Sequence, residues 1–149
     1  MTPPSAAAPA QTGQPQLARD TAADLATFFD VSLGLLVIRD LAGVIVRVSA
    51  SWAATLGYEP DDLIGLAILT LVHPDDLPAT LDSVTEVETR RPDAPVKGHV
   101  NRYRHRDGHY VTLEWRARRF GDRIYAVARD VTAKIGAERA LIEATAAAE

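Results

Sequence analysis

The chain has 149 residues and a formal net charge of −4, and it contains no cysteine. The missing cysteine excludes disulfides, thiolate metal ligands and any cofactor attached through sulfur. The length predicts one domain with its own core. Since no apolar run approaches the roughly 18 residues that span a membrane, and no signal peptide opens the chain, we expect a cytoplasmic protein.

Residues 1–19 predict a disordered tail. They contain four prolines and five alanines, and they offer almost no large apolar side chain whose burial could offset the entropy of ordering. Order is expected from residue 20 onward, because Thr21 and Asp24 have the spacing of a helix N-terminal capping box. Leu25 and Phe29 then follow at helical spacing, which predicts a short amphipathic helix.

Five β-strands are predicted in two groups. The first two strands are β-branched runs joined by a turn with Asp40 and Gly43, which is typical of a hairpin. The fourth predicted strand alternates apolar and polar residues, as a strand with one buried face does. The five ranges are 34–39, 44–48, 96–106, 109–117 and 122–131.

Helices are predicted between the two groups of strands. Pro60 is expected in the first turn of a short helix and Pro78 in the first turn of a longer one, since proline is tolerated there. The longer helix has an apolar stripe formed by Leu77, Leu81, Val84 and Val87. Residues 133–149 predict a C-terminal helix, so the fold class is α+β, with helices on one face of an antiparallel sheet.

Two histidines flank the turn at Asp107 and Gly108, which is a strong hairpin signal. A two-residue hairpin loop pairs residue 105 with 110 and residue 106 with 109. We therefore expect the imidazoles of His105 and His109 on opposite faces of the sheet, where they form no metal site.

Motifs of catalysis are missing from the sequence. It has no Gly-x-Ser-x-Gly nucleophile turn and no phosphate-binding glycine loop. The pair Asp61 and Asp62 and the pair Asp75 and Asp76 each open a helix, where the helix dipole stabilises carboxylates without any chemistry. We expect no enzymatic activity.

Charge is distributed unevenly along the chain. Residues 20–88 carry 12 acidic and 2 basic side chains, and residues 89–132 carry 11 basic and 5 acidic ones. We expect the two parts to neutralise each other within one fold. A nucleic-acid interface is a weaker alternative, because Glu114 interrupts the basic stripe and the overall charge is negative. The stripe is formed by Arg102, Arg104, Arg106, Arg116 and Arg118.

Several short motifs, in this order and spacing, resemble the PAS domain family. In the first half they are Asp40-x-x-Gly43, Ser49-Ala50-Ser51-Trp52, Leu56-Gly57-Tyr58 and His73-Pro74-Asp75-Asp76. In the second half they are Arg102-Tyr103-Arg104, Arg106-Asp107-Gly108, Glu114-Trp115-Arg116 and Ala128-Arg129-Asp130-Val131-Thr132. The resemblance implies a PAS domain at 20–132 with an N-terminal flanking helix and a signalling helix at 133–149, built on a five-stranded antiparallel sheet.

The resemblance implies sensing and signal relay rather than catalysis. A module of this kind is the input to a histidine kinase of a two-component system or to a cyclase, and it contacts an effector or sensor kinase in cis or in trans. It also implies a homodimer, which we expect through Leu25, Phe28 and Phe29 of the N-terminal helix. Nucleic acid is not expected as a partner.

No cofactor is identified by the sequence. The flavin-photoadduct relatives need a cysteine that this chain lacks. In haem-binding relatives a histidine of the long helix ligates iron, and Leu81 is expected at that place. Neither a photoadduct flavin nor haem is therefore expected.

Strand alternation predicts which side chains face the helices and could line a ligand pocket. Two interpretations stay open. Either Tyr103 and Trp115 fill the space as core, with Asn101 satisfied by backbone, or a small noncovalent ligand occupies it. The candidates are Asn101, Tyr103, Leu113, Trp115, Ala126 and Ala128.

The last strand ends on Asp130 and Thr132, which the resemblance assigns to signal coupling. We expect the Thr132 hydroxyl to cap a helix that begins near Ala133, with the Asp130 charge close to the same positive terminus.

Overall fold

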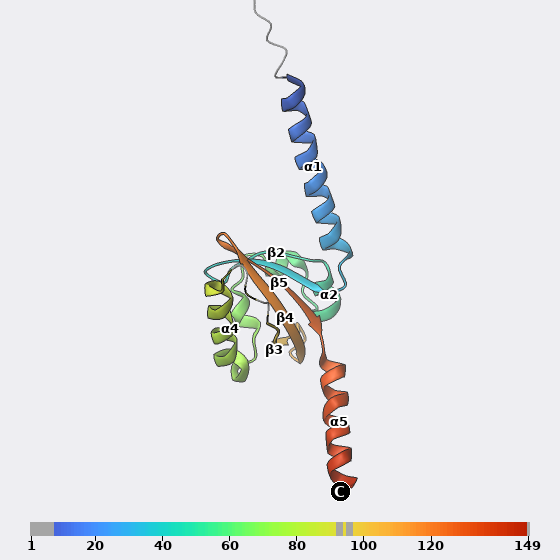
Figure 1. The fold of residues 1–149 in the computed structure, drawn as a ribbon. Helices are drawn as coiled ribbons and strands as arrows, with labels where there is room; N and C mark the ends of the chain where they lie inside the picture. The colour runs from blue at the N-terminus through green and yellow to red at the C-terminus, as the bar shows by residue number, and fades with distance from the viewer. Residues whose placement is uncertain (1–7, 92–93, 95–96, 149) are drawn as a thin grey trace, which may run out of the picture.

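The computed structural model describes residues 8–91, 94 and 97–148. Figure 1 shows a sheet with helices on one side and two longer helices that project away from it. The elements are α1 (Ala8–Val31), β1 (Leu35–Asp40), β2 (Ile45–Val48), α2 (Ser51–Leu56), α3 (Pro60–Leu63), η2 (Ile68–Leu71), η3 (Pro74–Asp76), α4 (Leu77–Thr89), β3 (His99–Arg104), β4 (Tyr110–Phe120), β5 (Arg123–Asp130) and α5 (Thr132–Ala148).

The five strands form one antiparallel sheet in the order β2-β1-β5-β4-β3. The predicted α+β class and the five strands are confirmed. Leu35 and Val37 of β1 and Leu113 of β4 are buried on the sheet face that the short helices cover. The core therefore lies between this face and the helices α2, α3 and α4.

Helix α2 is tied to β1 by polar groups as well as by packing. The buried Ser49 hydroxyl accepts a hydrogen bond from Leu36 N at 3.0 Å, and Ser51 Oγ donates to Gly34 O at 2.7 Å. Trp52, with none of its surface exposed, donates from Nε1 to Leu36 O at 2.9 Å. These bonds hold the Trp52 ring in the core, beside Tyr103 of β3 and Trp115 of β4.

Helix α1 is longer than the sequence predicts. It begins at Ala8 rather than near Thr21, so residues 8–19, which we expected in a disordered tail, are helical. Residues 1–7 of that tail lie outside the described residues. The expectation rested on the lack of burial, and α1 does project away from the domain (Figure 1). Its alanine and glutamine residues favour a helix even without burial, whereas Gly13 and Pro15 oppose one.

The helices between the strands begin where their prolines predict. Pro60 is the first residue of α3 and Pro78 lies in the first turn of α4. The predicted apolar stripe of α4 is wrong at Leu81, which is 46% exposed, whereas Thr80 is buried. Leu81 lies at the outer edge of the face defined by Leu77, Val84 and Val87, because successive residues advance about 100° around a helix.

The hairpin between β3 and β4 differs from the expected two-residue loop. Arg104 pairs with Tyr110, and His105 N donates to His109 O at 2.7 Å, so residues 105 and 109 are opposite each other. A two-residue type I′ turn needs positive φ at both central residues, but of Asp107 and Gly108 only the glycine has it, at +105°. The chain instead forms a three-residue loop, which puts His105 and His109 on the same face.

Candidate functional site

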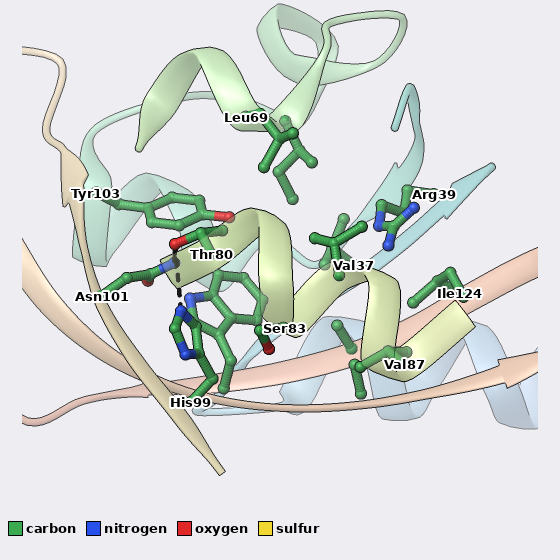
Figure 2. A pocket seen from close by; sticks show the side chains of 15 residues that line it. Val37, Arg39, Leu69, Thr80, Ser83, Val87, His99, Asn101, Tyr103 and Ile124 are labelled. Atoms are coloured by element: carbon green, nitrogen blue, oxygen red, sulfur yellow. Dashed lines mark hydrogen bonds between the residues drawn. The ribbon is translucent and has the colours of Figure 1, made fainter. Parts of the chain in front are cut away.

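An interior pocket of about 70 Å³ lies between α4 and the inner face of the sheet. Figure 2 shows Asn101, His99 and Tyr103 at one end of it, and Arg39, Val37 and Ile124 at the other. Helix α4 provides the opposite wall through residues one turn apart, namely Thr80, Ser83, Val84 and Val87.

A short hydrogen-bond chain forms the polar end of the pocket. Asn101 Nδ2 donates to Thr80 Oγ1 at 3.1 Å, and Thr80 Oγ1 lies 3.2 Å from His99 Nε2. Thr80 Oγ1 has a second lone pair and a hydrogen, so it pairs with either tautomer of His99. Burial lowers the pKa of His99 below its ordinary value, more than the nearby Asp76 carboxylate raises it.

Two buried polar atoms of pocket-lining residues have no hydrogen-bond partner among the described residues. They are Asn101 Oδ1, an acceptor, and Trp115 Nε1, a donor. Asn101 is 3% exposed and Trp115 is 7% exposed, so bulk water does not reach them. An unpaired buried polar group costs about 1–3 kcal/mol, and native proteins satisfy most such groups with a partner or an ordered molecule.

The rings of Tyr103 and Trp115 line this end, and the Trp52 ring packs against both of them in the core. The centroids of Tyr103 and Trp115 are 5.1 Å apart, and each lies within 6.4 Å of Trp52, all in tilted arrangements. Burial raises the pKa of the Tyr103 hydroxyl, so this group is a neutral phenol. The aromatic lining of this end is therefore rigid and uncharged.

The opposite end of the pocket carries a cation that already has partners. Arg39 is 6% exposed, and its Nη1 donates to Asp40 O at 3.0 Å and to Glu88 Oε1 at 3.3 Å. Buried charge is tolerated when it is paired in this way. The pocket is therefore close to neutral overall.

The structure brings four of the six predicted pocket residues together. Asn101, Tyr103, Trp115 and Ala126 line the pocket. Leu113 and Ala128 face the same side but are packed inside the core and do not reach the cavity. The expectation that backbone would satisfy Asn101 is wrong, because its amide bonds Thr80 and its oxygen has no partner.

Four polar lining residues were not among the predicted ones: Thr80 and Ser83 of α4, Arg39 of β1 and His99 of β3. Thr80 and Ser83 look like ordinary polar positions of an exposed helix face, whereas His99 follows from the same alternation that assigns Asn101 and Tyr103 to this face. Thr80 lies one helical turn from both Leu77 and Val84, so helical spacing places it on the same apolar face of α4.

The pocket residues do not fit a haem group. Leu81, expected at the ligating position, points away from the pocket and is 46% exposed, and the α4 residues that face the pocket are Thr80, Ser83, Val84 and Val87. Among the described lining residues the one imidazole is that of His99, and its Nε2 already faces Thr80.

The junction between β5 and α5 uses Asp130 and Thr132, but not as we expected. Thr132 Oγ1 accepts from Thr112 N of β4 at 2.9 Å, so the hydroxyl does not cap the helix. Asp130 Oδ1 instead accepts from Thr132 N at 2.9 Å, which satisfies the first N–H of α5. The capping side chain is thus two residues earlier in the chain, and the threonine hydroxyl links the start of α5 to β4.

The basic stripe is partly neutralised within the fold. Arg102 forms a two-pronged ion pair with Asp76, with the closest atoms 2.8 Å apart, and Arg106 lies 3.2 Å from Asp62. These pairs join the acidic first part of the chain to the basic second part, and they weaken the case for a nucleic-acid interface.

None of the helices in the described part of the chain is long and apolar enough to cross a membrane.

Comparisons with known proteins agree with this architecture. A family model described as PAS fold matches residues 45–128, and no curated protein matches the sequence. The PAS domain of an HTR-like protein from Haloarcula marismortui is similar at 23% identity and a TM-score of 0.66, over 80% of this chain and 98% of that one. A domain of a sensory box sensor histidine kinase/response regulator from Geobacter sulfurreducens is similar at 19% identity and a TM-score of 0.62, over 74% of this chain and 94% of that one. The RpfR quorum-sensing receptor PAS domain of Cronobacter turicensis, in complex with BDSF, is similar at 19% identity and a TM-score of 0.58, over 68% of this chain and 96% of that one.

The lowered pKa of His99 predicts a loss of stability in mild acid. The unfolded chain takes up a proton on this imidazole near pH 6.5, before the folded protein does, so the free energy of unfolding decreases as the pH falls below that value. We expect His99→Gln to show a smaller decrease between pH 7 and pH 5 in urea denaturation. An unchanged slope would contradict the prediction, and His73→Gln is the matched control.

Proposed function

We propose that this chain, which belongs to the PAS fold family, is a sensory module that binds a small molecule noncovalently and relays its presence to a partner protein. The observation that carries the proposal is the pair of unpartnered buried atoms on two pocket-lining residues, Asn101 Oδ1 and Trp115 Nε1. One is an acceptor and the other a donor, so a molecule with both a donor and an acceptor group would satisfy them together.

Size and charge restrict this ligand. A volume of about 70 Å³ is well below the roughly 300–1,000 Å³ of pockets for drug-sized molecules, so the ligand has only a few non-hydrogen atoms. The lining is mostly apolar, and the cation within it, Arg39, is already paired with Glu88. A neutral amide, alcohol or diol fits these conditions. The similar PAS domain of Cronobacter turicensis, solved in complex with BDSF, supports a ligand in a fold of this kind.

The output is proposed to pass through α5. This helix starts directly after β5, the central strand that carries the pocket residue Ala126. Asp130 and Thr132 hold its first turn to β5 and β4 through hydrogen bonds of 2.9 Å each. A movement of these strands on ligand binding would therefore reach α5. We propose a histidine kinase or cyclase as the effector, with no catalysis by this chain itself.

We also propose that the chain is a homodimer through α1 and the outer face of the sheet. Phe29 lies against this face, where Arg47 sits 4.4 Å over its ring. Leu25 and Phe28 remain 56% and 69% exposed, and Tyr125 and Val127 of the same face are each more than 40% exposed. A second copy would cover these apolar side chains.

Closing the pocket should abolish ligand binding. Ala126→Leu adds a larger side chain into the cavity, whereas Val127→Leu, on the outer face of the same strand, leaves the cavity unchanged. We expect native mass spectrometry and a thermal-shift panel of amides, alcohols and diols to detect a ligand for the original chain and for Val127→Leu but not for Ala126→Leu. Equal binding by all three, or no binding by the original chain, would refute the proposal.

Loosening the β5–α5 junction should uncouple the output. Asp130→Ala and Thr132→Ala each remove one hydrogen bond at the junction, which costs about 1 kcal/mol, so the melting temperature should change by only a few degrees. A histidine kinase fused after Glu149 is expected to lose its response to ligand in both variants and to keep it in Lys134→Ala. Normal signalling by both variants would show that the junction is structural only.

Adding a charge to α1 should separate the dimer. We expect Phe28→Glu to halve the mass measured by light scattering, and deletion of residues 1–30 to lower it to that of one shortened chain. Leu33→Glu, at a position that is 98% exposed beyond the end of α1, is the control and should leave the mass unchanged. A monomer before and after these changes would contradict the dimer.

A further inference from the structure

The tip of the β3–β4 hairpin brings three potential metal ligands together. His105 and His109 face each other across the loop, with ring centroids 4.5 Å apart and an interplanar angle of 20°. Asp107 lies between them, and one nitrogen of each ring and a carboxylate oxygen lie within 4.8 Å of one another. This grouping follows from the three-residue loop, because a two-residue loop would send the rings to opposite faces.

The carboxylate already contacts both imidazoles. Asp107 Oδ1 lies 3.2 Å from His105 Nδ1 and is hydrogen-bonded to His109 Nδ1. It also accepts from His109 N at 3.0 Å, which fixes its direction. The three side chains therefore converge on one point at the tip of the hairpin.

The hairpin that carries these groups is held in place from outside. Arg106 N donates to Leu56 O at the end of α2 at 2.8 Å, and the Tyr58 hydroxyl donates to Arg104 O at 2.8 Å. The His105 ring packs on Gly57 so closely that a Cβ there would lie 2.8 Å from its Cε1 atom. One ligand is thus supported by the body of the domain.

The other two ligands are open to solvent. The side chains of Asp107 and His109 are 61% and 58% exposed, whereas that of His105 is 22% exposed. A metal ion can therefore reach the cluster, and water can complete its coordination shell.

We propose that His105, Asp107 and His109 form a binding site for a divalent transition-metal ion of the Zn²⁺, Co²⁺ or Ni²⁺ type. Two imidazoles and one carboxylate suit these ions, whereas Mg²⁺ and Ca²⁺ prefer oxygen ligands alone. The ion takes the place of the proton between His109 Nδ1 and Asp107 Oδ1, and the neutral imidazole then carries its one proton on Nε2. Rotation of the exposed His109 and Asp107 side chains brings their donor atoms toward His105 Nδ1, which accepts from Asp107 N at 3.1 Å and exchanges this hydrogen bond for the ion.

The test is titration of the full chain, free of any affinity tag, with Zn²⁺ by calorimetry and with Co²⁺ by visible absorption. We expect one ion per chain, and we expect His109→Gln and Asp107→Asn each to weaken binding by at least about tenfold. Because both side chains are exposed, these variants should fold, and far-UV circular dichroism checks that they do. His73→Gln removes a histidine outside the cluster and should bind as the original chain does.

A melting-temperature measurement gives a second readout. Saturating Zn²⁺ is expected to raise the melting temperature of the original chain and of His73→Gln, but not of His109→Gln. Absence of saturable binding with one ion per chain, or unchanged affinity in both His109→Gln and Asp107→Asn, would overturn the proposal. Since none of these residues lines the interior pocket, the outcome is independent of ligand binding there.

Discussion

The ion pair between Asp76 and Arg102 fixes the position of α4, and the interior pocket depends on it. Asp76 Oδ2 accepts from both the backbone N and the Nε of Arg102, at 2.7 and 2.9 Å, while Oδ1 accepts from Nη2 at 2.8 Å. The Arg102 guanidinium holds the pKa of this carboxyl below its usual range. At the other end of α4, Arg90 donates to Ala117 O and Arg119 donates to Glu88 O. Because polar bonds hold both ends of the helix, its middle need not pack tightly on the sheet, and a cavity can persist there.

Much of the fold could be predicted because its signals are local. Alternating apolar residues gave the strands, and prolines at 60 and 78 marked helix starts, since both rules depend on a few neighbouring residues. The loop between β3 and β4 could not be predicted in the same way. Asp107 and Gly108 suit two loop lengths, and the choice depends on whether the residue before glycine adopts positive φ. A change of one residue in loop length therefore decides whether the side chains of His105 and His109 lie on the same face of the hairpin.

The candidate pocket was predictable on the sheet and not on the helix. Asn101, Tyr103 and Trp115 follow from period-two alternation, which assigns faces without further information. Thr80 could not be assigned, because a threonine in a helix is usually exposed, and it becomes a pocket residue only through the placement of α4 over β3. His99 of β3, in contrast, shares the face of Asn101 and Tyr103 by alternation. Trp52 belongs to α2 and packs against Trp115 of this region. The carbonyl of Leu56, the last residue of α2, accepts a hydrogen bond from Arg106 N in the β3–β4 loop.

The places where α1 and α5 join the sheet have a mechanical consequence. Leu35, which opens β1, pairs with Ala128 near the end of β5, so both helices attach at the same end of two adjacent strands. From there they run in opposite directions (Figure 1). With 17 residues at 1.5 Å each, α5 is a lever of about 25 Å. A pivot of about 10° at its base, through simple leverage, carries the far tip sideways by about 4 Å, roughly the spacing between neighbouring strands. Motions too small to disturb the core are thereby amplified into displacements that a docked helix would register.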